Sequence, residues 1–268
     1  MKRIISVALA LVLICSAFLF AGCQKEEAGD QSLQKVLDKG TFVLGLDDSF
    51  PPMGYRDENN EIVGFDVDVA REVCNRIGVE LKLQPISWTA KDQELNSGNI
   101  DCIWNGMSID EERKVAFNLS EPYMNNRMVL VVLGDSTYHT LADLKGKEVA
   151  VQKGSTAEKI LDNSEFIKTV KKTAAFNDNV TALMDMETKR VAAVFMDEVV
   201  ANNFITARQK NYRVINESLA DEQYAVGFRK ADQKLRDEVQ KTLSAMKKDG
   251  KLAEISTKWF GKDVTIVE

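Results

Sequence analysis

Short apolar stretches alternate with amphipathic helical patterns along most of this 268-residue chain. In the first half, the expected elements follow one another as strand 41–46, helix 64–78, strand 79–86, helix 87–95 and strand 102–104. This order is typical of a parallel sheet with helices on its faces, because a parallel connection needs a crossover element. The sequence therefore predicts an α/β fold.

A second series of the same kind begins at residue 148. Its expected strands are 148–151, 169–172 and 191–195, and its expected helices are 156–161, 179–187 and 198–207. Three further elements stand outside both series, namely the apolar strands 127–133 and 224–228 and the amphipathic helix 231–248. The length of the chain allows one large domain or two lobes.

The composition is that of an ordinary globular protein with an acidic balance. The chain is 44% hydrophobic and 28% charged, and its formal net charge is −6. An acidic chain without a basic run is a poor binder of nucleic acid. We therefore expect no nucleic-acid partner.

The first 22 residues have the pattern of an export signal, with basic residues before an apolar run. Residues 19–23, Leu-Phe-Ala-Gly-Cys, resemble the lipobox of bacterial lipoproteins, although Phe20 replaces the usual leucine. We predict a lipoprotein signal peptide at 1–22, lipidation of Cys23 and a polar tether at 23–32. The protein would then be extracytoplasmic and anchored to the cell membrane. The alternative is an uncleaved membrane-spanning helix.

Two cysteines, Cys74 and Cys102, lie among apolar residues of the expected core. We expect two buried free thiols, and a disulfide is the alternative. The single histidine, His139, lies beside a turn and is expected to be a solvated loop residue. No Cys/His spacing suggests a metal site, and no nucleophile-elbow pattern occurs near His139.

Residues 100–113 combine a short buried strand, a polar turn at Gly106 and a helix start. Ser108 or Asp110 can cap the free N–H groups of that helix, and Arg113 follows one turn later. A hydroxyl, bare N–H groups and a guanidinium together predict a site for a small carboxylate. The alternative is a capped helix with Arg113 paired to Asp110 on the surface.

Other polar residues stand where predicted strands end. Strand 41–46 leads into Asp47 and Phe50, at the edge where open α/β sheets keep ligands. Thr156 and Asp197 each stand at a later switch from strand to helix. We expect these residues to line a cleft, although helix capping would explain Thr156 and Asp197, and Phe50 could pack in the core.

With these patterns the chain resembles the extracytoplasmic solute-binding proteins of polar amino-acid ABC importers, bacterial solute-binding protein family 3. The most specific similar stretch is 64–77, and others are 47–52, 105–113, 143–147, 154–156 and 195–198. The resemblance implies a two-lobed, periplasmic-binding-protein-like type 2 fold with two crossing hinge strands. It places lobe 1 at 33–130 plus 228–268, lobe 2 at 131–227, and the hinges near 128–133 and 223–228.

The same resemblance implies a ligand site between the lobes. Arg113 would pair with the α-carboxylate of an amino acid, and Asp197 would bind its ammonium group. Further hydrogen bonds to the carboxylate would come from Ser108, Thr156 and the N–H near Gly106 or Met107.

Aromatic side chains would form the walls of this site, namely Phe50, Trp88 and Trp104. The predicted ligand-binding set is completed by Asp47, Asn105 and Ser155. A polar ligand is favoured, and an acidic one disfavoured, because Asp47 would repel a second carboxylate.

The resemblance implies a lipid-anchored receptor that captures a free polar amino acid. It would deliver the amino acid to an ABC permease and its ATPase, act as a monomer, and use neither cofactor nor metal. It would catalyse nothing. The alternatives are a dehydratase on the same fold, which needs a further acid or base, and a sensory binding subunit.

Overall fold

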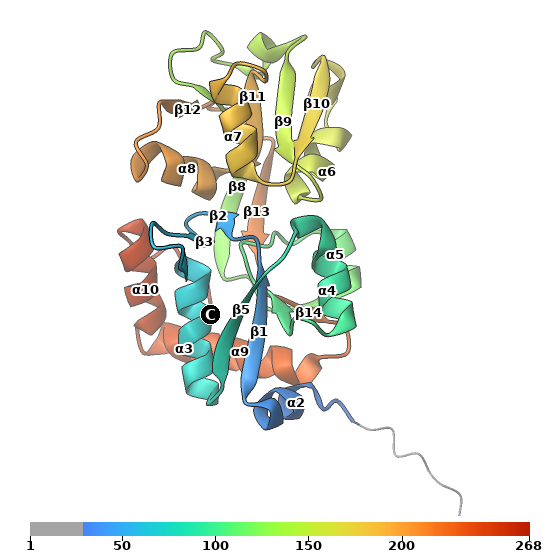
Figure 1. Cartoon of the computed structure of the whole chain (residues 1–268), viewed down its shortest axis with the longest axis vertical. Helices are drawn as coiled ribbons and strands as arrows, with labels where there is room; N and C mark the ends of the chain where they lie inside the picture. The colour runs from blue at the N-terminus through green and yellow to red at the C-terminus, as the bar shows by residue number, and fades with distance from the viewer. Residues whose placement is uncertain (1–28) are drawn as a thin grey trace, which may run out of the picture.

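The computed structural model describes residues 29–268 and shows two lobes joined by a pair of strands (Figure 1). The predicted signal peptide, Cys23 and the first part of the predicted tether lie outside the described residues. None of the helices within residues 29–268 combines the length and the apolar character that a bilayer crossing requires.

Lobe 1 is built on a five-stranded sheet in the order β5-β1-β6-β14-β7. Its strands are β1 (Thr41–Leu46), β5 (Glu80–Pro85), β6 (Cys102–Ile103), β7 (Phe117–Leu119) and β14 (Gly227–Arg229). β1 runs parallel to β5 and β6, whereas β14 runs antiparallel to β6 and β7. A small antiparallel sheet beside it contains β2 (Ser49–Phe50), β3 (Gly54–Arg56) and β4 (Ile62–Val63).

Helices pack around this sheet (Figure 1). They are α2 (Ser32–Lys39), α3 (Phe65–Ile77), α4 (Lys91–Ser97), α5 (Glu111–Ala116), α9 (Gln233–Lys248) and α10 (Lys251–Phe260). α3 buries Val69 and Val73, as its apolar spacing predicts, and α9 buries Leu235 and Val239 in the same core.

Lobe 2 contains a six-stranded sheet with the path β10-β9-β11-β8-β12, and β13 pairs with β8. Its strands are β8 (Met124–Leu133), β9 (Glu148–Gln152), β10 (Lys172–Phe176), β11 (Ala193–Asp197), β12 (Tyr212–Val214) and β13 (Ala220–Tyr224). Its α-helices are α6 (Thr156–Asn163), α7 (Asn179–Glu187) and α8 (Glu198–Thr206).

The two lobes are connected by β8 and β13, which run side by side between them (Figure 1). The two strands pair antiparallel, with Met124 opposite Tyr224 and Met128 opposite Ala220. Beyond Met128, β8 pairs with β11 and β12 inside lobe 2. The paired segments therefore begin a few residues earlier than the expected hinges.

The two-lobed α/β fold is confirmed, and β1 pairs parallel with β5 and β6, as the strand–helix order predicts. Both sheets are nevertheless mixed, because β8 and β14, on the connections between lobes, enter them antiparallel. The expected strand 169–172 is wrong. Ser164 caps a short 3₁₀ helix at Glu165–Lys168, so the strand starts only at Lys172.

Cys74 and Cys102 are buried free thiols, as expected. Burial raises the pKa of Cys74 to about 12 and that of Cys102 well above its usual value. A thiol that stays protonated is a poor nucleophile, so these two cysteines act as small apolar core residues.

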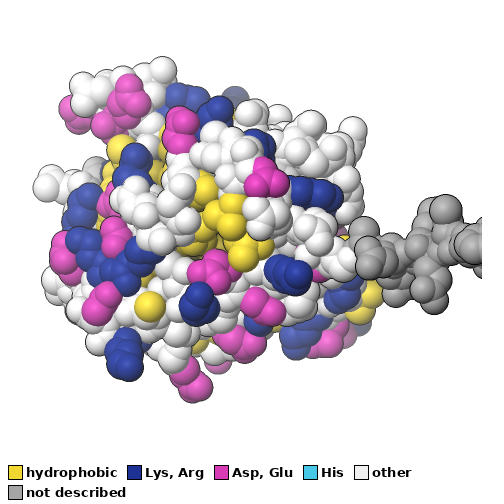
Figure 2. All heavy atoms as spheres, turned by 90° about the horizontal axis from the view of Figure 1, so that it is seen from below, with side chains coloured by type: hydrophobic (Ala, Val, Ile, Leu, Met, Phe, Trp, Pro, Cys, Tyr) yellow, Lys and Arg dark blue, Asp and Glu magenta, His cyan; other side chains and the backbone are white. Residues whose placement is uncertain are grey.

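The end of lobe 1 that faces away from lobe 2 is where the described chain begins, next to α2 (Figure 1). Seen from that end, the surface mixes Lys and Arg with Asp and Glu around a hydrophobic area (Figure 2). The Ser32 hydroxyl accepts a hydrogen bond from the N–H of Leu235 at 3.1 Å, which fixes the start of α2 on α9.

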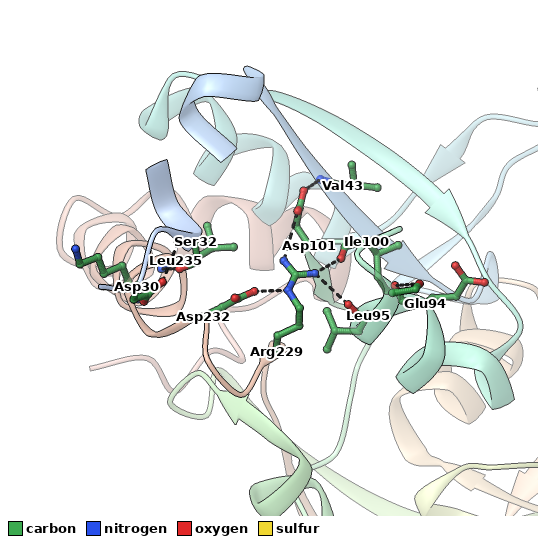
Figure 3. Close-up of polar contacts among 12 residues, drawn as sticks. Asp30, Ser32, Val43, Glu94, Leu95, Ile100, Asp101, Arg229, Asp232 and Leu235 are labelled. Carbon is green, nitrogen blue, oxygen red and sulfur yellow. Dashed lines mark hydrogen bonds and ion pairs between the residues drawn. The ribbon is translucent and has the colours of Figure 1, made fainter. Parts of the chain in front are cut away.

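Arg229 ties the last strand of lobe 1 to the loop that precedes β6 (Figure 3). One guanidinium nitrogen donates to the carbonyls of Leu95 at 3.0 Å and Ile100 at 2.7 Å. Nε lies 2.6 Å from Asp232, and a third nitrogen lies 3.7 Å from Asp101. One side chain thus satisfies two carbonyls and faces two carboxylates.

We expect Arg229→Ala to lower the free energy of unfolding by about 2–4 kcal/mol, because it leaves buried acceptors and charges without a partner. Urea unfolding measures the loss. Lys241→Ala is the matched control. The Lys241 side chain is 74% exposed, so its ion pair with Glu238 should contribute less than ~1 kcal/mol to stability. Equal losses in the two variants would contradict the role given to Arg229.

Candidate ligand-binding site

A narrow cavity lies between the two lobes, with about 300 Å³ of empty space when the solvent at its opening is included. Its lining residues are Asp47, Phe50, Trp88, Asn105, Gly106, Ser108, Arg113, Met128, Gln152, Ser155, Thr156 and Asp197. All but two of the residues predicted for the ligand site are in this set, and the exceptions are Trp104 and Met107.

The turn 105–108 is held in place by Asp66, a buried carboxylate at the start of α3. Asp66 accepts hydrogen bonds from the N–H of Gly106 at 2.7 Å and from the hydroxyl of Tyr123 at 2.9 Å. Gly106 has a φ of +57°, and a Cβ there would lie 2.9 Å from the ring of Phe50. The N–H of Gly106 is therefore already used by Asp66. The expectation that this N–H binds the ligand's carboxylate is wrong.

Arg113 lies in the first turns of α5, in lobe 1, and is 7% exposed. Its guanidinium donates to the carbonyl of Ser108 at 2.7 Å and lies 5.9 Å from the ring centre of Trp88. Asp110 caps α5 by accepting from the N–H of Arg113 and is 4.0 Å from the guanidinium. Burial lowers the pKa of Arg113, while Asp110 and other acidic groups oppose this. The charge of Arg113 therefore faces the cavity. It does not face bulk water, as the surface alternative required.

Asp197 ends β11 in lobe 2, on the other side of the cavity. One of its oxygens accepts from the hydroxyl of Tyr224 at 2.6 Å and from the amide of Asn126 at 2.9 Å. Within the described chain its side chain makes no capping hydrogen bond to α8, so capping does not explain this residue. Burial raises its pKa to about 6, and the two donors and Arg113 lower it.

The N-terminus of α6 also faces the cavity. Ser155 is the cap, because its hydroxyl accepts from the N–H of Glu158 at 3.1 Å. The hydroxyl of Thr156 is buried and has no hydrogen-bond partner among residues 29–268. The positive end of a helix and an unpaired hydroxyl are suited to a carboxylate.

Asp47 closes the other end of the cavity through a contact between the lobes. Its carboxylate accepts from the amide of Gln152, on β9 in lobe 2, at 2.7 Å. Its own N–H donates to the side chain of Asn105 at 3.1 Å. Burial raises the pKa of Asp47. Lys159 and Glu112 form a second contact between the lobes at 2.8 Å, so the cleft is closed in this structure.

Trp104 and Met107 are fully buried inside lobe 1, and we correct the expectation that Trp104 forms a wall of the site. The ring of Trp104 packs 6.4 Å from that of Tyr123, centre to centre. Neighbouring side chains after β6 point to opposite sides, so Asn105 lines the cavity while Trp104 points into the core.

Several residues of the site were not expected from the sequence. Gln152 and Met128 line the cavity, and Glu222 accepts from the hydroxyl of Ser108 at 2.7 Å. The place of Gln152 in the site could have been predicted, because it is a polar residue at the carboxyl end of an apolar strand. Met128 and Glu222 lie on the crossing strands, where no local pattern shows which face meets the site.

Donors and acceptors thus meet in one small cavity. The guanidinium of Arg113 and the start of α6 supply donors, and the carboxylate of Asp197 supplies an acceptor from the opposite side. A small molecule that carries both an anionic and a cationic group fits this arrangement. The fold and the site define a two-lobed binding protein whose ligand is enclosed between the lobes.

Comparison with known proteins identifies the family. Residues 42–262 match the bacterial extracellular solute-binding proteins, family 3, and the chain belongs to this family. It is 31% identical to the L-cystine-binding protein TcyJ of Escherichia coli (strain K12) over 259 residues, 96% of each chain.

Solved structures of the same kind superpose closely on this chain. Tv2483 bound to L-arginine is 33% identical, with a TM-score of 0.85 over 89% of this chain and 98% of that one. The substrate-binding protein of an ABC uptake transporter from Streptococcus pneumoniae, with bound histidine, is 35% identical, with a TM-score of 0.85 over 89% and 99%.

The carboxyls around the cavity predict how stability depends on pH. Burial raises the pKa of Asp66 to about 7, of Asp197 to about 6 and of Glu222 to about 7. Between pH 5 and 7 the folded state therefore binds more protons than the unfolded state, so stability falls as pH rises. We expect the ligand-free protein to be at least ~2 kcal/mol less stable at pH 7.5 than at pH 5.5 in urea unfolding.

The variant Asp66→Asn is the control for this pH effect, because its amide does not titrate. Its stability should change less between the two pH values than that of the wild type. A wild type whose stability is constant or rises over this range would contradict the buried, protonatable carboxyls.

Proposed function

We propose that this protein is the receptor of an ABC importer and that it closes on a free polar amino acid. One observation carries the proposal, namely that a buried guanidinium of lobe 1 and a buried carboxylate of lobe 2 face the same closed cavity. A zwitterion that leaves water needs partners for both charges, since an unmatched charge costs several kcal/mol. In this proposal Arg113 and the start of α6 bind the α-carboxylate, and Asp197 binds the ammonium group. The ligand then contacts both lobes, which favours the closed form.

The charge of the cavity favours neutral polar or cationic side chains over acidic ones. Asp47 and Asp197 line it together with one cation, Arg113, so the lining carries a negative excess. Phe50 and Trp88 add aromatic side chains to the lining, and the ring centre of Trp88 already lies 5.5 Å from the Lys91 ammonium and 5.9 Å from the Arg113 guanidinium. The named ligands of the similar proteins, L-cystine, L-arginine and histidine, are all polar amino acids.

We further propose that Cys23 carries the lipid anchor and that the receptor delivers its ligand to a membrane permease and the associated ATPase. The described chain starts at the end of lobe 1 that is farthest from lobe 2 (Figure 1). An anchor attached there leaves the mouth of the cleft free to meet a permease. This arrangement agrees with an extracytoplasmic monomer tethered to the membrane.

We infer binding without catalysis. The Asp47 and Asp197 carboxylates already accept hydrogen bonds from protein donors, and in this proposal Asp197 is matched to the ammonium group. His139 lies in a loop of lobe 2, where its backbone N–H donates to Asp143. A dehydratase would need a further acid or base aimed at its substrate.

Calorimetric titration with L-arginine, L-histidine, L-cystine, L-citrulline and L-glutamate tests the proposal. We expect binding near the micromolar range, about −8 kcal/mol, with L-arginine ahead of its neutral analogue L-citrulline and L-glutamate weakest. Arg113→Ala and Asp197→Ala should each weaken binding at least tenfold, because one ligand charge stays unpaired.

Arg127→Ala is the control for these two variants. Arg127 lies on β8 but is half exposed and pairs with Glu198 outside the cavity, so its loss should leave affinity unchanged. A wild type that binds no amino acid would refute the proposed function. Full affinity in Arg113→Ala would remove this residue from the site.

Metabolic labelling with a radioactive fatty acid tests the anchor. The wild type and Cys74→Ser should incorporate label in the membrane fraction, and Cys23→Ser should not, because Cys74 is buried. Equal labelling of Cys23→Ser would place the lipid elsewhere.

A further inference from the structure

We propose that Glu222, on the crossing strand β13, is a positioning residue that turns the hydroxyl of Ser108 into an acceptor for the ligand's ammonium group. This inference rests on the proposed function above. The Ser108 hydroxyl donates its hydrogen to Glu222 at 2.7 Å. Ser108 lines the cavity, whereas Glu222 lies behind it and is not among the described lining residues.

The chemistry follows from the hydroxyl of Ser108. A hydroxyl has one hydrogen to donate and two lone pairs that accept. Because the hydrogen is directed to Glu222, the oxygen can offer only lone pairs to the cavity. Without Glu222 the hydroxyl could rotate and donate to a carboxylate instead. Glu222 thereby makes Ser108 a second acceptor beside Asp197, in place of the hydrogen bond from Ser108 to the carboxylate that the resemblance implied.

Both acceptors are held by the same face of β13. Glu222 and Tyr224 are two residues apart on this strand, so their side chains point to the same side. Glu222 binds Ser108 of lobe 1, and Tyr224 donates to Asp197 of lobe 2 at 2.6 Å. One segment that connects the lobes therefore positions both acceptors of the ammonium site.

The charges around Glu222 favour an incoming cation. Asp197 on β11 faces it with a like charge, and Arg113 on α5 is the nearby cation. Asn126 of β8 lies directly opposite in the strand pair, and Tyr224 is the titratable neighbour on its own strand. Burial and Asp197 raise the pKa of Glu222 to about 7. An ammonium group would supply the missing positive charge and would release a proton from this carboxyl on binding.

The test compares Glu222→Gln with the wild type by calorimetry between pH 5.5 and 8.5, using L-arginine, L-histidine or L-cystine, whichever binds the wild type most tightly. We expect wild-type affinity to rise through pH 7 as Glu222 loses its proton. Glu222→Gln should bind about tenfold more weakly at pH 8 and should lose the part of the pH dependence near 7. Its remaining pH dependence should lie near pH 6, where Asp197 titrates.

The matched control is Asp221→Asn, which removes the same charge from the adjacent, exposed position on β13. It should keep both the affinity and the pH profile of the wild type. A drop in Asp221→Asn equal to that in Glu222→Gln would show a general charge effect and overturn the proposal.

A double-mutant cycle with Ser108→Ala tests whether Glu222 acts through this hydroxyl. In the Ser108→Ala background, Glu222→Leu, which removes the acceptor that a glutamine would keep, should cost less affinity than it does in the wild type, because the part that acts through the hydroxyl is already lost. An equal loss in both backgrounds would overturn the proposal. If Glu222→Gln does not fold, Glu222→Asp keeps the charge but shortens the reach, and unchanged affinity in that variant would also overturn it.

The two proposals fail in different ways. A wild type that binds none of the three amino acids refutes the proposed function itself. A wild type that binds, together with a Glu222→Gln variant of equal affinity and equal pH profile, refutes only the role of Glu222.

Discussion

The site depends on keeping a positive and a negative side chain apart across the cavity between the lobes. Arg113 and Asp197 are both buried, yet each is hydrogen-bonded to its own surroundings and not to the other. Ser108 supports the guanidinium, and Tyr224 supports the carboxylate. Each charge is therefore only partly compensated, which leaves electrostatic energy that a ligand with two opposite charges can recover. Under the proposed function, ligand binding and closure are one process, because neither lobe alone offers both partners.

The fold supplies this arrangement through the ends of its strands. Asp47 and Asn105 follow β1 and β6 of lobe 1, while Gln152 and Asp197 end β9 and β11 of lobe 2. The carboxyl ends of parallel strands lie at one edge of a sheet, and here the two sheets turn those edges toward each other. Asp66, buried at the start of α3, then holds the turn that contains Asn105.

The end of β1 was predictable to the residue, and Asp47 and Asp197, placed after predicted strands, both line the cavity. Helix α7 was also predictable with both its bounds, because its apolar spacing and its flanking residues agree. The direction of a side chain is harder to predict, since a shift of one residue moves Trp104 from the cavity to the core. The crossing strands are harder still. Their alternation shows that Glu222 and Tyr224 share a face, but only the tertiary pairing shows that this face meets Ser108 and Asp197.

The raised pKa values of the buried carboxyls predict opposite pH dependences for stability and for ligand binding. In the empty protein, Asp197 and Glu222 are held where their charged forms are disfavoured, so ionisation weakens the fold. A bound ammonium group favours those same charged forms. Ionised Asp197 and Glu222 destabilise the empty protein, and only a ligand with a positive charge relieves this cost. Under the proposed function, an acidic ligand would add to it, so the fold itself would take part in the selection against acidic amino acids.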